Sequence, residues 1–244
     1  MGNLNGKYAV VTGAAKGLGR AIVQRLIEDG AENVAVLDFD LETLNESASH
    51  WGEKVLVIQC DVSDSASVKS AFDAIVEEYG RIDILVNNAG VTRDAMLGKM
   101  TIEQWEKVIS VDLNSVFYFT NLAAPLMKAQ KYGKIINKSS LAAFGNVGQG
   151  NYAAAKAGVV GLTRTTAKEL ARYNVTVNAI CPSMINTDII KTIPDKVKQT
   201  LLNAVPAARI GEPEEVAGVV SFLACDDSSY VTGEVIRVSG GAVL

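Results

Sequence analysis

The stretch YAVVTGAAKGLG, residues 8–19, joins a run of apolar and β-branched residues to a glycine-rich turn. Gly13, Gly17 and Gly19 follow the run with the spacing G-x3-G-x-G, and a helix is expected from about Gly17. Glycines at a strand-to-helix junction permit a tight turn, let a pyrophosphate approach the backbone and direct a helix N-terminus at it. The stretch therefore predicts a phosphate-binding turn in an α/β fold.

An acidic residue further along the chain strengthens this interpretation. Three glycines in a short segment also occur in purely structural loops, so the motif is weak when taken alone. Asp38 lies nineteen residues after Gly19, at the end of the apolar run NVAVLD (33–38). A dinucleotide-binding fold places a carboxylate there to bind the adenosine ribose hydroxyls. The pair favours a dinucleotide site over a structural loop followed by a helix-capping aspartate.

Apolar runs and amphipathic segments alternate along the rest of the chain. Further strands are expected at KVLVIQC (54–60), RIDILVN (81–87), GKIINKS (133–139), NVTVNAIC (174–181) and VIRVS (235–239). Helices are expected between them, among them 65–80, 101–130 and 212–224. Continuous Val/Ile runs separated by helices indicate a parallel sheet covered on both faces. We therefore expect an α/β fold: a Rossmann-like, doubly wound parallel sheet of about seven strands.

Length and composition favour one domain. The chain has 244 residues, of which 48% are hydrophobic, and no linker-like run divides it. We expect a single domain over 1–244, with a cofactor half at about 1–90 and a catalytic and substrate half at about 91–244. A net charge of -4 without a Lys/Arg stripe argues against a nucleic-acid partner. The N-terminus lacks signal-peptide features and no window reaches 18 apolar residues, so a cytoplasmic protein without a membrane span is expected.

The cysteine and histidine content excludes several kinds of chemistry. Cys60, Cys181 and Cys225 are odd in number, far apart and in apolar contexts, which fits packing residues in a reducing compartment. His50 is the sole histidine. The chain therefore lacks the histidines of a multi-histidine zinc site and has a single candidate for a histidine-based triad. No metal site is predicted.

The segment GNYAAAKAG (150–158) carries one phenol and one ammonium in a run of Ala and Gly. Residues four apart lie on one face of a helix, so Tyr152 and Lys156 should point the same way and can act on one group. These nine residues alone leave open the alternative of a surface Tyr and Lys on a helix packed through small residues.

The order and spacing of several motifs resemble those of the short-chain dehydrogenases/reductases over essentially the whole chain. The matching pieces are TGAAKGLG (12–19), CDV (60–62), NNAG (87–90), the serine of NKSS (137–140), Tyr152-x3-Lys156 and VTGEVIRVSGG (231–241). Within the family, NNAGVTRD and QGNYAAAKAG are most similar to the 3-oxoacyl-thioester reductases of fatty-acid and polyester synthesis.

The resemblance implies an NAD(H)-dependent oxidoreductase that interconverts a ketone and a secondary alcohol. Its expected substrate is a small-molecule ketone or alcohol, or an acyl thioester, and its expected assembly is a homotetramer. A 3-oxoacyl-thioester reductase competes with a dehydrogenase of another apolar secondary alcohol or hydroxysteroid. A third alternative is a dinucleotide sensor without turnover. The presence of Ser139, Tyr152 and Lys156 together argues against it, because a sensor does not need a proton donor.

The resemblance also implies roles for the catalytic residues. Tyr152 would protonate the carbonyl oxygen, and Lys156 would lower the pKa of Tyr152 and hold the nicotinamide ribose. An ammonium about 4 Å away supplies roughly 4 kcal/mol at an effective dielectric of about 20, enough to lower a phenol pKa of ~10 by about 3 units. The family's serine lies thirteen residues before the tyrosine, which selects Ser139 as donor to the substrate oxygen, with Ser140 as runner-up.

Cofactor and substrate residues carry over by position. NAD is expected rather than NADP, because Asp38 would repel the 2′-phosphate that Lys16 could otherwise meet. The expected cofactor residues are Gly13, Lys16, Gly17, Leu18, Gly19, Asp38, Asp61, Val62, Asn88, Ala89, Gly90, Tyr152, Lys156, Pro182, Ile185 and Thr187. An apolar substrate mouth, or else ordinary core, is expected from Leu141, Phe144, Val147, Met184, Ile185, Ile189 and Ile193.

Three residues depart from the family pattern. Ser183 follows Cys181-Pro182 where Pro-Gly is usual, and Lys138 replaces an apolar residue in the fifth strand. Asp112 stands where the family has an asparagine thought to hold a water that links the lysine to solvent. An ionised Asp112 would oppose formation of the Tyr152 phenolate, so it is counted with the catalytic residues; a helix-capping role is the alternative.

Overall fold

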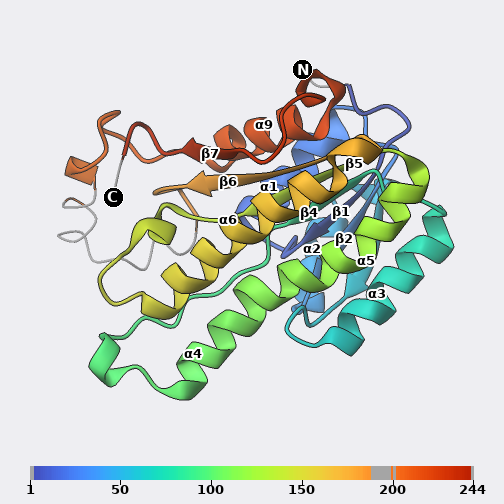
Figure 1. Cartoon of the computed structure of the whole chain (residues 1–244). Coiled ribbons are helices and arrows are strands. Elements are labelled where there is room, and N and C mark those ends of the chain that lie inside the picture. The colour runs from blue at the N-terminus through green and yellow to red at the C-terminus, as the bar shows by residue number, and fades with distance from the viewer. Residues whose placement is uncertain (1–2, 188–198, 200–201, 243–244) are drawn as a thin grey trace.

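The computed structural model describes residues 3–187, 199 and 202–242. Seven parallel strands form one sheet in the order β3-β2-β1-β4-β5-β6-β7 (Figure 1). The strands are β1 (Tyr8–Thr12), β2 (Asn33–Asp38), β3 (Val55–Gln59), β4 (Ile84–Asn87), β5 (Gly133–Lys138), β6 (Val175–Pro182) and β7 (Val235–Val238). The expected doubly wound, Rossmann-like sheet is confirmed.

Helices cover both faces of this sheet (Figure 1). The α-helices are α1 (Gly17–Glu28), α2 (Leu41–Ala48), α3 (Ser65–Tyr79), α4 (Ile102–Ile109), α5 (Ser115–Gln130), α6 (Gly150–Leu170) and α9 (Pro213–Ala224). Shorter turns of helix are η1 (Gly52–Lys54), η2 (Leu97–Lys99), η3 (Ser110–Asn114), η4 (Leu141–Phe144), η5 (Ala171–Tyr173) and η6 (Asp226–Ser228). Helices α1, α2 and α9 bury apolar residues on one face, and α3, α5 and α6 on the other.

The alternation of side chains along the strands divides the core in two. Successive strand residues point to opposite faces, so Val11 packs with α1 and α9 while its neighbour Val10 packs with α3 and α5. Along α3, Val68, Phe72 and Ile75 lie on one face of the helix and are buried in this second core. Both cores need apolar residues, and for this reason the strand sequences are mostly apolar.

The long helical segment expected over 101–130 contains an irregular turn. Thr101 and Gln104 form a capping box at its start. The α-helical pattern then changes to the π-helical turn η3 before α5 continues to Gln130. Asp112 lies in this turn and is fully buried. Such π-turns inside α-helices often occur at functional sites.

The strand order places the site. The sheet grows in one direction from β1 through β2 and β3, and in the other from β4, so the order reverses between β1 and β4. Ligands of open parallel sheets bind at such a switch point, outside the carboxyl ends of the strands. The segments after β1, β2, β3, β4 and β5 all start at this edge.

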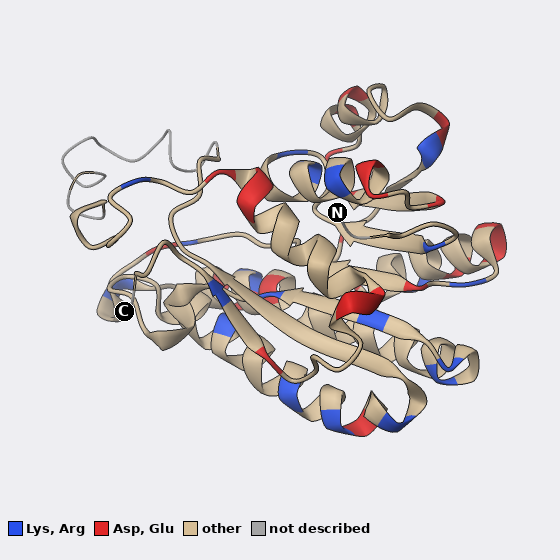
Figure 2. Ribbon diagram, turned by 90° about the horizontal axis from the view of Figure 1, so that it is seen from above, with Lys and Arg blue, Asp and Glu red and all other residues tan. Residues whose placement is uncertain are grey.

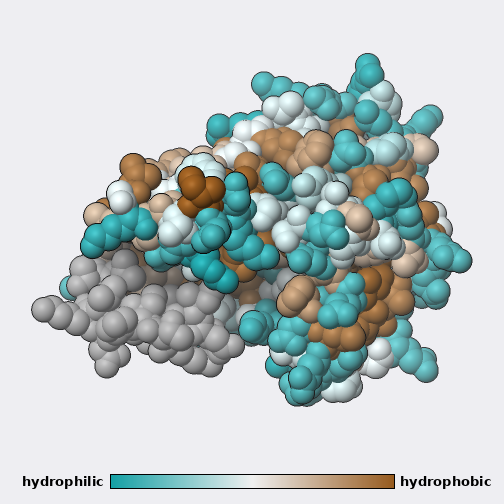
Figure 3. All heavy atoms as spheres, turned by 90° about the horizontal axis from the view of Figure 1, so that it is seen from below, coloured by the Kyte–Doolittle hydropathy of each residue, from teal (hydrophilic) through white to brown (hydrophobic). Residues whose placement is uncertain are grey.

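The surface mixes charged and apolar regions. Segments with Lys or Arg are interspersed with segments carrying Asp or Glu (Figure 2), and apolar side chains gather in patches between hydrophilic ones (Figure 3). In the part of the chain that the structure describes, no helix combines the length and apolar composition needed to cross a bilayer. Cys60, Cys181 and Cys225 are buried free thiols, as expected of packing residues.

Candidate active site

The glycine turn after β1 brings helix α1 close to the strand. Gly13 and Gly17 have positive φ angles of 65° and 55°, which glycine adopts at little cost. A Cβ atom on Gly19 would overlap the carbonyl oxygen of Gly13, and one on Gly13 would lie 2.8 Å from the Cα of Ala89. The turn therefore requires its first and third glycines for close backbone packing.

The N-terminus of α1 is open to a ligand. Its N-cap residue, Lys16, is extended and makes no capping hydrogen bond through its side chain, and the first turn contains no acidic residue. The first backbone N–H groups of a helix lack intrahelical partners and attract anions. This arrangement fits a pyrophosphate, as the sequence predicted.

A cleft of about 530 Å³ extends from this turn along the carboxyl edge of the sheet. Its lining contains most of the expected cofactor residues and several others. The lining residues are Gly13, Lys16, Gly17, Leu18, Gly19, Asp38, Phe39, Cys60, Asp61, Val62, Asn88, Ala89, Gly90, Val91, Arg93, Lys107, Val111, Lys138 and Thr187.

Asp38 is held in place at one end of the cleft. Its Oδ2 accepts a hydrogen bond from the Ala15 backbone N–H at 3.0 Å, and its Oδ1 accepts one from Asp40 at 3.2 Å. Two main-chain donors on separate segments thus fix the carboxylate. Its position fits the predicted contact with ribose hydroxyls.

Asp61 and Val62, two of the expected cofactor residues, also line the cleft. Ser63 donates hydrogen bonds to Asp61 from its backbone N–H at 2.9 Å and from its hydroxyl at 2.6 Å. These bonds lower the pKa of Asp61, against a smaller opposing effect of burial. Asp61 therefore remains a carboxylate.

Asn88 acts as a brace between β4 and the glycine turn. Its Nδ2 donates to the carbonyl oxygens of Thr12 and Gly13, both at 2.9 Å, and Thr12 Oγ1 accepts from the backbone N–H groups of Asn88 and Ala89. The side chain is buried, so its role in cofactor binding is to hold the turn. Gly90 then passes over the catalytic residues: a Cβ there would lie 2.5 Å from Asp112 Oδ1.

Helix α6 carries the Tyr152–Lys156 pair to this edge. Lys156 is fully buried, and its Nζ lies 5.5 Å from the Tyr152 ring centroid. The same Nζ donates to the Lys138 carbonyl oxygen at 3.0 Å and forms an ion pair with Asp112 Oδ1 at 3.0 Å. Asp112 Oδ2 accepts from the Val91 backbone N–H at 2.9 Å. The carboxylate thus contacts the catalytic lysine and is not limited to capping a helix bend.

Burial and two opposite charges set the protonation of the pair. Burial raises the pKa of Tyr152, Lys156 lowers it and Asp112 raises it again, so the phenol is protonated without ligands. Burial lowers the pKa of Lys156, but the Asp112 carboxylate and, when it is ionised, Tyr152 outweigh this effect, so the pKa is raised. Lys156 therefore stays an ammonium across the neutral range.

The structure places the two adjacent serines on opposite sides. Ser139 is buried and donates its hydroxyl to the Lys156 carbonyl oxygen at 2.9 Å, within the core. Ser140 faces the other way, and its side chain interacts with the Tyr152 phenol and lowers the pKa of that group. Successive residues at a strand end point to opposite sides, so only one of the two hydroxyls can face the site. Ser140, the runner-up, holds the position beside Tyr152.

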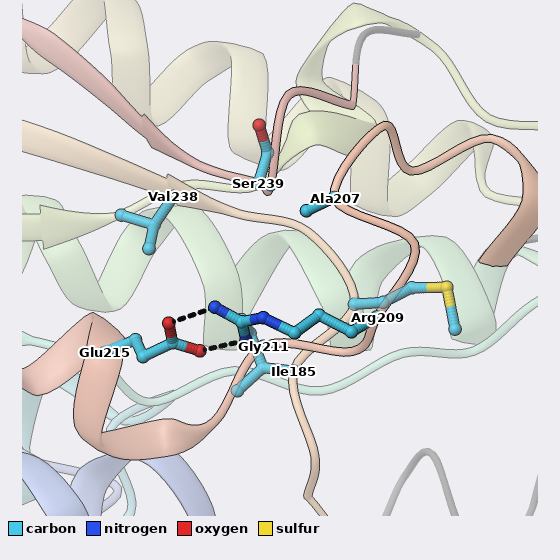
Figure 4. A pocket seen from close by; sticks show the side chains of 9 residues that line it. Ile185, Ala207, Arg209, Gly211, Glu215, Val238 and Ser239 are labelled. Carbon is cyan, nitrogen blue, oxygen red and sulfur yellow. Dashed lines mark hydrogen bonds and ion pairs between the residues drawn. The ribbon is translucent and has the colours of Figure 1, made fainter.

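Four of the expected cofactor residues, Tyr152, Lys156, Pro182 and Ile185, do not line this cleft. Pro182 and Ile185 are buried. Ile185 belongs to the core and borders a separate cavity of about 110 Å³ beside the Arg209–Glu215 ion pair (Figure 4). Its backbone forms a bridge with Gly211, and its side chain lies against this glycine.

The expected substrate mouth is only partly visible. Phe144 and Val147 are 54% and 84% exposed, whereas Leu141 is buried in the core. Met184 lines the same separate cavity as Ile185. Ile189 and Ile193 lie outside the described residues.

Sequence reasoning missed Asn151, which orients the catalytic tyrosine. Its Nδ2 donates to the carbonyl oxygens of Arg93 and Gln104, both at 3.0 Å, and its Oδ1 accepts from the Tyr152 backbone N–H at 2.8 Å. The only signal in the sequence is a polar residue directly before the tyrosine. Phe39, Val91, Arg93, Lys107 and Val111 also line the cleft unpredicted. Within the described residues, no cluster of three or more His, Cys, Asp or Glu side chains could hold a metal ion.

Comparison with known proteins agrees with this geometry. A family model described as enoyl-(acyl carrier protein) reductase matches residues 13–243. The 3-oxoacyl-(acyl-carrier-protein) reductase FabG of Thermotoga maritima is 46% identical over 99% of both chains, and that of Staphylococcus aureus is 42% identical over 98% of both. The crystal structure of levodione reductase superposes with a TM-score of 0.93 at 35% identity, covering 98% of each chain. The chain therefore belongs to the short-chain dehydrogenase/reductase family of oxidoreductases, which act on CH–OH and ketone groups with a nicotinamide dinucleotide.

Proposed function

We propose that the protein reduces 3-oxoacyl thioesters to 3-hydroxyacyl thioesters with NADH. One observation carries this proposal: Ser140, Tyr152 and Lys156 meet beside a dinucleotide cleft, in a chain whose relatives over nearly its whole length are named 3-oxoacyl reductases. The cofactor, when bound, supplies the hydride that adds to the carbonyl carbon.

The chain's own residues manage the carbonyl oxygen. Tyr152 donates its phenolic proton to this oxygen as the hydride arrives, and the Ser140 hydroxyl donates a hydrogen bond to it as negative charge develops. Lys156 stays protonated and stabilises the phenolate that remains, until solvent returns the proton. Asn151 keeps the start of α6 in register with the cleft.

The activity is tested with a panel of ketones. The absorbance of NADH is followed with an acetoacetyl thioester, a cyclic diketone and a 3-oxosteroid, using wild type and Tyr152→Phe. We expect the thioester to be the best substrate, and Tyr152→Phe to lose turnover by a factor of about 10³ or more while still binding NADH, because the ring remains and only the proton donor is lost. The exposed-surface variant Lys168→Met serves as the control and should keep full activity. Substantial turnover by Tyr152→Phe would contradict the assignment.

A second candidate is a reductase of a cyclic or other apolar ketone. The close match of the fold to levodione reductase favours it. Higher efficiency on the cyclic diketone or the steroid than on the thioester would replace the first proposal with this one. Binding of NADH without turnover of any ketone would instead favour a dinucleotide sensor.

The preference for NADH rests on Asp38. Its carboxylate is fixed by two backbone N–H groups, so it cannot move away from a 2′-phosphate. Lys16 is exposed. The hydrogen bonds from Thr43 are the main cause of the lowered pKa of Asp40, and the charge of Lys16 is a smaller one, so the Asp40 carboxylate partly counters this charge. We expect Asp38→Ala to abolish or reverse the preference, while Glu42→Ala, outside the cleft, leaves it unchanged. Wild-type kcat/KM higher with NADPH would refute this choice.

We also infer a homotetramer. Phe117 of α5 and Phe222 of α9 are 50% and 42% exposed, so each of these helices presents a large apolar side chain that a neighbouring copy could cover. Sedimentation of the wild-type chain should give the mass of four copies, and Phe222→Glu should lower it. A monomer at all concentrations would contradict the inference.

A further inference from the structure

Lys138 is a cation in the wall of the cofactor cleft, at a strand position where the family resemblance predicts an apolar side chain. It is the last residue of β5 and lines the cleft together with Gly90, Val91 and Thr187. Strand alternation places it on the same side as Ser140 and opposite to Ser139. Its own carbonyl oxygen accepts the hydrogen bond of Lys156 Nζ at 3.0 Å. Lys138 therefore lies at the catalytic end of the cleft, where the nicotinamide must meet the substrate.

Among the described residues, the charged groups that act on Lys138 are one lysine and one carboxylate. Lys156 of α6 and Asp112 of η3 are the charged groups that act on it most strongly, and Asp112 is already in contact with Lys156. Arg93, after β4, lines the same cleft. On the neighbouring strand β6, Lys138 pairs with Ile180, which does not ionise, and the next residue is Cys181. The ammonium of Lys138 thus has no carboxylate of its own among these groups.

Lys138 is the member of this group that changes charge near neutral pH. Burial lowers the pKa of Lys138 to about 7, Lys156 adds to this effect and Asp112 opposes it. Burial raises the pKa of the Cys181 thiol and of the Tyr152 phenol, so both stay neutral, and Lys156 stays charged. The positive charge at this end of the cleft therefore falls by one as the solution passes from acid to base.

We propose that the charge on Lys138 sets the relative affinity of the cleft for oxidised and reduced nicotinamide dinucleotide. The inference rests on the proposed function in one respect, that the cleft holds such a dinucleotide. The oxidised nicotinamide ring carries a positive charge that the reduced ring lacks, and the rest of the molecule is the same. A charged Lys138 repels the oxidised ring and not the reduced one, so acid favours NADH and base favours NAD+.

The ratio of two dissociation constants isolates this effect. Contacts to the phosphates, ribose and adenine are common to both nucleotides, so their pH dependence cancels in Kd(NAD+)/Kd(NADH). We expect calorimetry between pH 6 and pH 9 to show this ratio falling about tenfold or more in the wild type as Lys138 loses its proton. Binding of NAD+ should also release a proton near pH 7, seen as a dependence of the binding heat on the buffer.

Three variants make the test specific. Lys138→Met should give a low ratio that does not change with pH, and Lys138→Arg, which keeps its charge, should give a high ratio throughout. Lys134→Met is the matched control, because Lys134 is a buried lysine of the same strand with a lowered pKa, outside the lining of the cleft; it should keep the wild-type slope. Circular dichroism verifies that each variant is folded.

A ratio independent of pH in the wild type, or a wild-type slope in folded Lys138→Met, would overturn the inference while leaving the proposed function intact. Failure of the wild type to bind either nucleotide would overturn both.

Discussion

At the scale of single residues, the direction of a side chain decides which of two adjacent serines faces the Tyr152 phenol. Ser139 points into the core and donates a hydrogen bond to the Lys156 carbonyl oxygen, whereas Ser140 lies beside the Tyr152 phenol. Ser140 also accepts a hydrogen bond from the Ala142 backbone N–H at 3.1 Å, which fixes its hydroxyl oxygen. The two hydroxyls therefore have separable functions.

Ser140→Ala should reduce kcat by a factor of about 10² to 10³, because it removes a donor to the developing oxyanion. Ser139→Ala should keep most of its kcat and lose about 1 kcal/mol of stability, because it removes only a buried hydrogen bond. Steady-state kinetics and urea denaturation of both variants measure these effects. The opposite order of kcat, in folded proteins, would return the catalytic role to Ser139.

Asp112 determines how far the Lys156 ammonium lowers the pKa of Tyr152. Its carboxylate raises the pKa of Tyr152 and compensates the ammonium that lowers it. Asp112→Asn should therefore lower the pKa of Tyr152 and shift the basic limb of the pH profile for alcohol oxidation by about one unit toward lower pH, without abolishing activity.

Asp94→Asn is the control for this shift, because Asp94 raises the pKa of Tyr152 least among the groups that act on it. It should move the profile less than Asp112→Asn does. Identical profiles for Asp112→Asn and wild type, at equal cofactor affinity, would show that the carboxylate has no electrostatic effect on catalysis.

At the scale of elements, the contact between α1 and the turn after β1 forms the phosphate site. Gly19 of α1 has no space for a Cβ, since this atom would overlap the Gly13 carbonyl oxygen. The clash involves backbone, which cannot rotate away as a flexible side chain could. A side chain at position 19 must therefore move α1 relative to β1, and with it the N–H groups that would face a pyrophosphate.

Gly19→Ala should weaken NADH binding at least about a hundredfold, because the phosphate site is a feature of the whole junction. Gly161→Ala in α6 is the matched control: nothing lies within 4 Å of its Cβ position, so binding should be unchanged and stability raised by about 0.5–1 kcal/mol. Titration of NADH fluorescence and thermal denaturation test the pair. Wild-type affinity in folded Gly19→Ala would show that the junction tolerates the displacement.

At the scale of the whole molecule, the lowered pKa of Lys138 makes stability depend on pH. Lys138 has a pKa of about 7 in the folded chain against ~10.4 when unfolded. Between these values the unfolded chain binds a proton that the folded chain does not. The free energy of unfolding therefore rises with pH in this window, by at most about 1.4 kcal/mol per unit.

Lys138→Met should flatten this rise and increase the free energy of unfolding at pH 7 by about 1–3 kcal/mol, because a partly buried cation with a lowered pKa is replaced by an apolar side chain. Urea denaturation at pH 7, 8 and 9, at one fixed protein concentration, measures both effects. Lys168→Met, an exposed residue of α6, should leave the slope unchanged. A slope of zero in the wild type would contradict the titration of Lys138.

Much of the fold and part of the site follow from local patterns in the chain. Continuous apolar runs specify buried parallel strands, the glycines before α1 specify a phosphate turn, and an interval of four places Tyr152 and Lys156 on one helix face. These features depend on neighbours in sequence, so the seven strands, the cleft and the position of Asp38 could be predicted.

Only the tertiary structure decided which side chains from distant segments meet. The contact of Asp112 with Lys156 depends on a π-turn in one helix facing another helix, and neither spacing nor composition specifies it. The choice of Ser140 over Ser139 depends on the side of the sheet that the end of β5 presents. Ile185 turns toward Gly211 because of a bridge between remote segments. Burial and charge act through space, and for this reason the electrostatics of the site became visible only once the chain was folded.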